Sequence, residues 1–360
     1  MKKILSQIIQ PLFFAVLLFC SSAASSQVIQ KKKLTEAELK EENKLKQIGN
    51  YLDKISASEK QKGKEKAQLT MLYLAKGVLH RADKNKYPVD ADKKSTERVV
   101  ADYVEGMSPA MYEKINGRIK AMLADNGRKA TALGKYSGID LTQQTKPQLV
   151  KMPGLKISEV EYNNKVVADL PPTFDLLLSA VHCMDETDPE SGDDDIVVGA
   201  LLSGPGNKIR VANAVFCGRF DDGDNSNMGD YQFGKVSMSN QSYPKTFYTV
   251  FQMVEADYGE NEAALELNEL MNYVITIIDP QETQSAGVMA AMIGYFASYF
   301  SEEGFMETIA VKMELRSANE LYVNDIPVPM ANGISDGWKI MRIDGHSGLY
   351  RVKLKIRVSN

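Results

Sequence analysis

Three short segments in the second half of the chain together contain 14 carboxylates. The first runs from Asp185 to Asp195, the second from Phe220 to Asp230, and the third follows Val254. Carboxylate oxygens are the ligands that hard cations such as Ca²⁺ prefer, and Ca²⁺ takes six to eight of them. The candidate ligands for Ca²⁺ are Asp185, Asp188, Asp193, Asp194, Asp221, Asp222, Asp224 and Asp257.

The acidic segments lie between stretches that have the apolar pattern of β-strands. These strands are expected at 174–183, 196–202, 209–217, 231–238 and 247–254. Consecutive antiparallel strands alternate in direction, so the first, third and fifth connections reach the same end of the sheet. The acidic segments are these odd-numbered connections, whereas residues 203–207 and 239–245, the even-numbered ones, contain no acid. The sequence therefore predicts one acidic end.

Two interpretations of this acidic end are open. No segment fits an EF-hand loop, because with Asp222 at position 1 the expected Gly is Asn227 and the expected Glu is Phe233. The end binds a cation, or it is a solvated acidic surface that aids solubility.

The stretch from Cys183 through Asp185-Glu186-Thr187-Asp188 to Gly192-Asp193-Asp194 resembles an acidic strand-end segment of uncharacterised secreted bacterial proteins. The arrangement also resembles C2-type β-sandwiches, in which acidic loops at one end bind Ca²⁺. This resemblance implies a sandwich fold and a Ca²⁺ site, and it brings no family activity with it. The helical insertion after Val254 departs from a plain sandwich.

Nucleophilic and zinc chemistry find no support in the residue pattern. His182 and Cys183 are neighbours on a strand, so their side chains point to opposite faces and cannot form a catalytic pair. Cys183 and Cys217 both lie at inward positions, which leaves a disulfide or two buried free thiols. The three histidines, at positions 80, 182 and 346, lack the spacing of zinc ligands. We therefore expect that the chain is not an enzyme.

The first 26 residues have the order of a signal peptide. Lys2 and Lys3 precede an apolar run at 11–20, and small residues follow at 21–26. The apolar run is too short to span a membrane, which takes about 20 residues. The pattern predicts an exported protein of the periplasm, the cell surface or the exterior.

The mature chain divides by charge. Residues 27–150 carry 25 Lys/Arg against 16 Asp/Glu, and residues 151–360 carry 16 against 31. The first part, 27–130, has helix starts at Ser56, Ser95 and Ser108, and Glu59 completes a capping box with Ser56. A basic helical region is one signature of nucleic-acid binding, but export argues against that partner. The predicted regions are a signal peptide (1–26), a basic helical domain (27–130), a Gly/Pro-rich linker (131–155) and an acidic β-rich domain (156–360).

Two helices are expected to interrupt the β pattern at 261–303. Within them, residues 283–301 carry no charge, and small residues recur there at every fourth position from Ala286 to Ser298. Such a ridge lets another backbone approach closely. The segment predicts a helix that is buried between the sheet and a neighbouring element. The alternative is a hairpin that inserts into a membrane.

The last strand has strict period-two alternation. Its apolar residues are Tyr350, Val352, Leu354, Ile356 and Val358, and its cations are Arg351, Lys353, Lys355 and Arg357. We expect one face on a core and a ladder of cations on the other. The fold class is therefore α+β, an N-terminal helical domain followed by an antiparallel β-sandwich-like domain with two inserted helices.

These patterns predict an exported binding or structural protein of the bacterial envelope or exterior, Ca²⁺-dependent through its acidic end. Its partner would be a protein or another envelope component. The alternative is a secreted effector or toxin whose helices at 261–303 enter a membrane, with 283–301 as the inserting segment.

Overall fold

The computed structural model describes most of the chain after residue 48. The described residues are 35–36, 49–152, 172–185, 194–205, 210–238, 242–255, 260–277, 286–300, 305–335, 339–345 and 348–359. The predicted signal peptide, 1–26, lies outside them, so export stays a prediction. The chain divides into two compact units, Met1–Lys40 and Glu41–Asn360. The elements below belong to the second unit.

Three helices before residue 130 begin where the sequence predicts, at Ser56, Ser95 and Ser108. The Glu59 N–H donates to Ser56 Oγ at 3.2 Å, and the Ser56 N–H donates to Glu59 Oε2 at 3.0 Å, so the expected capping box is formed. Ser95 and Ser108 cap the next two long helices. The helical elements of this region are η1 (Tyr51–Asp53), α3 (Ala57–Ala82), α4 (Thr96–Glu105), α5 (Pro109–Ala124), α6 (Asn126–Leu133), η2 (Gly134–Tyr136) and α7 (Thr145–Val150).

The stretch expected to be a linker, 131–155, is described as far as Met152, and there it is folded. It contributes the end of α6, then η2 and α7, and buries Leu133, Tyr136 and Leu149 against the rest of the helical region. Gly134, with a φ of +51°, marks the end of a short helix rather than the start of a flexible connection. The division into two domains stays a prediction.

Two buried side chains of opposite charge hold part of this stretch in place. Lys76 on α3 has no exposed surface, and Glu97 on α4 is 2% exposed. Lys76 Nζ donates to the carbonyl oxygens of Leu141 at 2.5 Å and of Gln143 at 2.9 Å. The Thr145 N–H donates to Glu97 Oε1 at 3.2 Å. Burial lowers the pKa of Lys76 and raises the pKa of Glu97, and the attraction between the two charges opposes both shifts.

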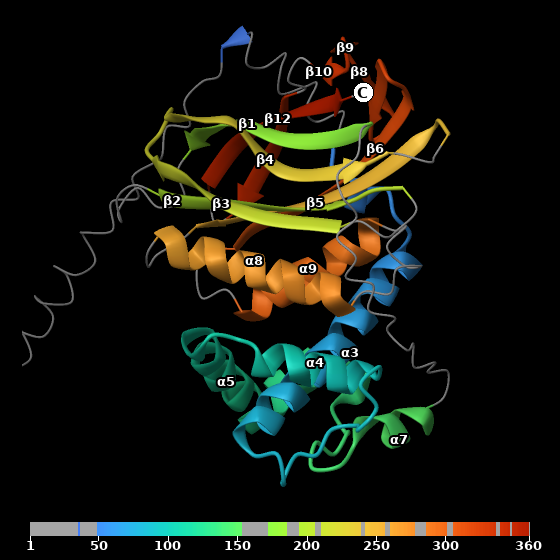
Figure 1. Cartoon of the computed structure of the whole chain (residues 1–360). Helices are drawn as coiled ribbons and strands as arrows, with labels where there is room; N and C mark the ends of the chain where they lie inside the picture. The colour runs from blue at the N-terminus through green and yellow to red at the C-terminus, as the bar shows by residue number, and fades with distance from the viewer. Residues whose placement is uncertain are drawn as a thin grey trace, which may run out of the picture. The chain divides into compact units, whose positions relative to one another are not determined.

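The region after residue 172 is an antiparallel β-sandwich of two sheets (Figure 1). In sheet A the order is β4-β1-β12-β10-β9, and β11 also pairs with β12; in sheet B it is β3-β2-β5-β6-β7-β8. The strands of sheet A are β1 (Thr173–Asp185), β4 (Asn225–Ser237), β9 (Met330–Ala331), β10 (Ile334–Ser335), β11 (Lys339–Gly345) and β12 (Gly348–Ser359). The strands of sheet B are β2 (Asp194–Ser203), β3 (Arg210–Phe220), β5 (Lys245–Glu255), β6 (Phe305–Ser317), β7 (Glu320–Val323) and β8 (Ile326–Val328).

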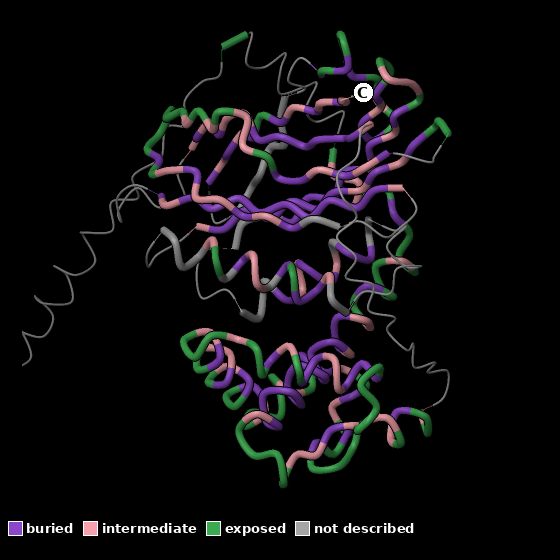
Figure 2. The backbone as a smooth tube through the Cα atoms, viewed as in Figure 1, coloured by how far each residue is buried: buried purple, intermediate pink, exposed green. Residues whose placement is uncertain are grey.

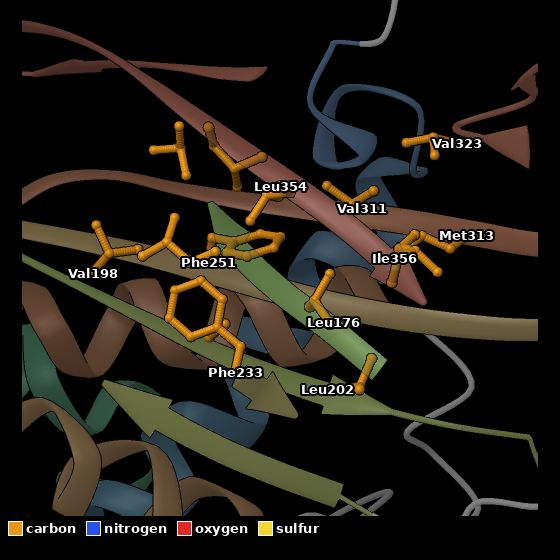
Figure 3. Packing of buried hydrophobic residues seen from close by; sticks show 14 of the residues in the cluster. Leu176, Val198, Leu202, Phe233, Phe251, Val311, Met313, Val323, Leu354 and Ile356 are labelled. Atoms are coloured by element: carbon orange, nitrogen blue, oxygen red, sulfur yellow. The ribbon is translucent and has the colours of Figure 1, made fainter. Parts of the chain in front are cut away.

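The main core lies between the two sheets. Figure 3 shows side chains of Leu176 and Leu354 from sheet A beside Val198 and Phe251 from sheet B. The alternation predicted for β12 is confirmed, because its apolar residues are buried while its cations are partly or fully exposed (Figure 2). The fold is therefore α+β, with a helical region followed by the sandwich.

The two inserted helices, α8 (Glu260–Ile277) and α9 (Ala286–Phe300), cover the outer face of sheet B (Figure 1). The apolar residues of α9 that are buried there are Val288, Met289, Met292, Ile293 and Phe296. α9 also packs against α3. In the described part of the chain, no helix combines the length and hydropathy that membrane crossing requires. Insertion through 283–301 stays untested, and it would have to remove these side chains from the core.

Direct hydrogen bonds join the helical region to the insertion and to sheet B. Tyr273 Oη on α8 donates to the carbonyl oxygen of Thr70 on α3 at 3.1 Å. Asn50 pairs with β6 through both ends of its amide: Nδ2 donates to Thr308 O at 2.9 Å, and the Ala310 N–H donates to Oδ1 at 3.0 Å. The helical region and the sandwich thus share buried contacts.

Gly63 on α3 tests the packing of α3 against α9. A Cβ on Gly63 would lie 2.6 Å from Ala291 Cβ and 3.2 Å from the backbone oxygen of Val288, so Gly63→Ala must push the helices apart. We expect a loss of about 1–3 kcal/mol in the free energy of unfolding, measured in urea. Gly117, inside α5, has open space around it, and Gly117→Ala should stabilise by about 0.5–1 kcal/mol. Equal effects at the two sites would contradict the close packing.

Candidate functional site at the acidic end of the sandwich

Strand pairing brings the strand ends that flank the acidic segments to one end, as the strand directions predict. Asp230 of the second segment lies within β4 instead, because that strand begins at Asn225. Asp194, which begins β2, lies opposite Phe220, which ends β3. Glu255, which ends β5, lies opposite Ile196 near the start of β2. The sequence predicts these strands as one alternating series, whereas β1 and β4 belong to sheet A and β2, β3 and β5 to sheet B. The strand ends that flank these connections still meet at one end, because the two sheets stack face to face.

The β3–β4 turn is tied to the end of β1 by its backbone. The Cys183 N–H donates to Asp224 O at 2.9 Å, and the Gly223 N–H donates to Cys183 O at 3.2 Å. Asp221, Asp222 and Asp224 are all exposed. Two of their carboxylates accept bonds within the turn: Asp224 Oδ2 from the Asp221 N–H and Asp221 Oδ1 from the Asp222 N–H, each at 3.1 Å.

Five of the eight candidate ligands are described. Asp185, Asp194, Asp221, Asp222 and Asp224 all lie at the acidic end. Asp188, Asp193 and Asp257 lie outside the described residues. Among the residues that are described, no three His, Cys, Asp or Glu side chains are arranged to hold a metal ion. A site made only of described carboxylates is therefore not formed in this structure.

A buried acid lies beneath the exposed turn. Asp194 is 1% exposed, and the buried Tyr350 donates its hydroxyl to Asp194 Oδ2. Burial and this carboxylate hold the pKa of Tyr350 well above its usual range. The Phe220 ring meets the Tyr350 ring edge to face, with centroids 5.8 Å apart. Sequence reasoning missed this pair; the only signal was a tyrosine at an inward position of β12.

Cys183 and Cys217 are free thiols in the structure, and both are buried. Burial raises the pKa of each thiol to about 12. A thiol with such a pKa is almost entirely protonated at neutral pH, so neither cysteine is an activated nucleophile. Of the two alternatives left open by the sequence, the structure has the pair of buried hydrophobic thiols.

The described histidines are bonded to backbone. His80 Nδ1 lies 2.8 Å from Tyr87 O, and His182 Nδ1 lies 2.9 Å from Asp224 O. His346 lies outside the described residues. His182 therefore helps to fix the acidic β3–β4 turn against β1.

The described part of the chain thus combines a helical region with a two-sheet antiparallel sandwich that has one acidic end. Comparison of the chain with protein families, curated proteins and solved structures gave no match.

Proposed function

We propose that this chain is an exported binding or structural protein of the bacterial envelope or exterior, and that the acidic end of its sandwich binds Ca²⁺. The observation that carries the proposal is the convergence of acidic strand ends. Within sheet B it is seen in the pairing of Asp194 with Phe220 and of Glu255 with Ile196. The backbone bonds of Cys183 add the end of β1 from sheet A, because they tie it to the β3–β4 turn. Like charges held together repel, and a hard cation with oxygen ligands relieves that repulsion. Both the Ca²⁺ site and the expected export remain to be tested.

The state of the other reactive groups supports binding rather than catalysis. The two thiols are buried and protonated, with each pKa raised to about 12. His80 and His182 each use Nδ1 to contact a backbone carbonyl oxygen. The buried Asp194 accepts the Tyr350 hydroxyl. In each case the group that could do chemistry has a structural role.

The proposal predicts that Ca²⁺ stabilises the mature protein. A ligand that binds only the folded state adds RT ln(1 + [L]/Kd), or about 2.7 kcal/mol at a hundredfold excess over Kd. The melting temperature in millimolar Ca²⁺ should therefore exceed that in chelator, and Mg²⁺ should do less, because it demands a tighter octahedral shell. Differential scanning calorimetry measures this.

Matched variants distinguish Ca²⁺ binding at the acidic turn from a general screening of surface charge by the added salt. Asp222→Asn with Asp224→Asn should remove the Ca²⁺ effect and raise stability in chelator, because the repulsion is lost with the charges. The amide introduced by Asp224→Asn keeps an oxygen that can accept from the Asp221 N–H. Asp53→Asn, at an exposed aspartate of η1, should leave the Ca²⁺ effect intact. Equal melting temperatures in Ca²⁺ and chelator would reduce the acidic end to a solvated surface.

A further inference from the structure

The four cations of β12 divide into two pairs on the outer face of sheet A. Lys355 and Arg357 share one carboxylate, that of Asp230 of β4, whose Oδ2 lies 2.8 Å from Lys355 Nζ and 3.8 Å from Arg357 Nη2. Arg351 and Lys353 make no ion pair within the part of the chain that the structure describes, and Lys353 is exposed. Arg351 Nη2 is buried and has no hydrogen-bond partner there.

The two cations without an ion pair lie next to each other on the same face of β12. The pairing register sets positions 342 and 339 of β11 opposite Arg351 and Lys353. We call Arg351 and Lys353 the cation patch. They lie in a region whose net charge is strongly negative. An anion placed against them would supply the partner that Arg351 Nη2 lacks among the described residues.

The acidic β3–β4 turn lies on the same molecule, separated from the cation patch by strand β1. Asn225, next to the acidic β3–β4 turn, pairs with His182 of β1, and His182 pairs with Arg351. Neighbouring strands are about 4.8 Å apart, so about 10–15 Å separates the acidic turn from the cation patch. The positive and negative surfaces are thus held side by side, with β1 between them.

We propose that two copies of this chain associate about a two-fold axis, with the cation patch of each copy facing the acidic β3–β4 turn of the other. A two-fold interface repeats every contact twice, so a surface with adjacent opposite charges is complementary to itself. The acidic turn is the anionic surface that the structure itself supplies. This proposal does not depend on Ca²⁺ binding.

Charge reversal tests the pairing directly. Lys353→Glu and Asp222→Lys alter exposed side chains on opposite sides of the interface. Each alone should weaken self-association at least about tenfold, because both symmetric contacts become repulsive. An equimolar mixture of the two variants should restore it, because both contacts between unlike copies are then attractive. Lys93→Glu, at an exposed lysine of the helical region, is the control that should change nothing.

Sedimentation velocity of the mature protein measures these effects over a range of NaCl concentrations. We expect a dimer that weakens as salt rises, and recovery in the mixture but in neither variant alone. A chain that stays monomeric at all concentrations, or a dimer that both variants leave unchanged, overturns the proposal. So does a monomer that uses Lys353 to bind heparin or anionic vesicles instead. If Ca²⁺ binds the acidic turn, it should weaken the dimer, because it neutralises the charges that face the cation patch. A dimer that responds to charge reversal but not to Ca²⁺ supports the dimer and contradicts only the proposed Ca²⁺ site.

Discussion

Lys76→Met is expected to lower the free energy of unfolding by about 3–5 kcal/mol, since it leaves Glu97 as a buried charge without its cation. Lys76 has no exposed surface, and its Nζ holds the carbonyl oxygens of Leu141 and Gln143. Methionine keeps most of the volume, so the loss reports charge and hydrogen bonding rather than a cavity. Urea unfolding followed by far-UV circular dichroism gives the value.

A double variant tests the coupling between the two charges. Glu97→Gln added to Lys76→Met should restore part of the lost stability, because the uncompensated charge is gone. A coupling energy above about 1 kcal/mol is expected, because the two buried charges attract each other. Lys93→Met, at an exposed position, should stay within about 0.5 kcal/mol of the parent. Additive effects of the two buried changes would show that Lys76 and Glu97 do not act on each other.

The raised pKa of Glu97 also has a consequence for pH. A carboxyl group whose folded pKa lies above its unfolded value favours the folded state most at low pH, and this contribution falls as pH rises through the folded pKa. Stability of the parent relative to Glu97→Gln should therefore decrease as pH rises above about 4.5.

Tyr350→Phe is expected to cost about 3 kcal/mol of unfolding free energy, the second-largest effect. It removes the hydroxyl that donates to the buried Asp194 carboxylate and that also bonds to the Cys183 thiol, while the ring stays in the core beside Phe220. Chemical denaturation measures the loss. Tyr322→Phe is the matched control, since that hydroxyl bonds to the exposed Glu320 at 3.3 Å and its loss should cost well under 1 kcal/mol. Equal costs at the two tyrosines would mean that Asp194 does not depend on Tyr350.

Local sequence patterns predicted the features that depend on a single helix or strand. The alternation in β12 predicted which of its residues are buried and which are exposed, and Ser56 with Glu59 predicted the start of α3. Strand direction gave the shared end of the acidic connections. The strands from β7 to β10 were missed because each is only two to four residues long, too short for a periodic signal. The longer strands β6 and β11 were missed as well.

Long-range pairings could not be predicted in this way. Lysine is normally an exposed residue, so nothing in the sequence marks Lys76 as buried; its burial follows from the path of residues 139–145. Tyr350 and Asp194 lie 156 positions apart, and their contact depends on how the two sheets stack. Gly and Pro are typical of linkers, so the stretch at 131–155 was interpreted as one. The same residues also end short helices, and a glycine of this stretch does so.

A crystal structure of the mature protein grown in Ca²⁺, with anomalous data to identify the ion, would show directly whether a cation binds. We expect a bound Ca²⁺ at the acidic end, with oxygen ligands from the β1–β2 connection and from Asp221, Asp222 or Asp224 of the β3–β4 turn. Crystals in saturating Ca²⁺ that show no cation at this end would contradict this expectation.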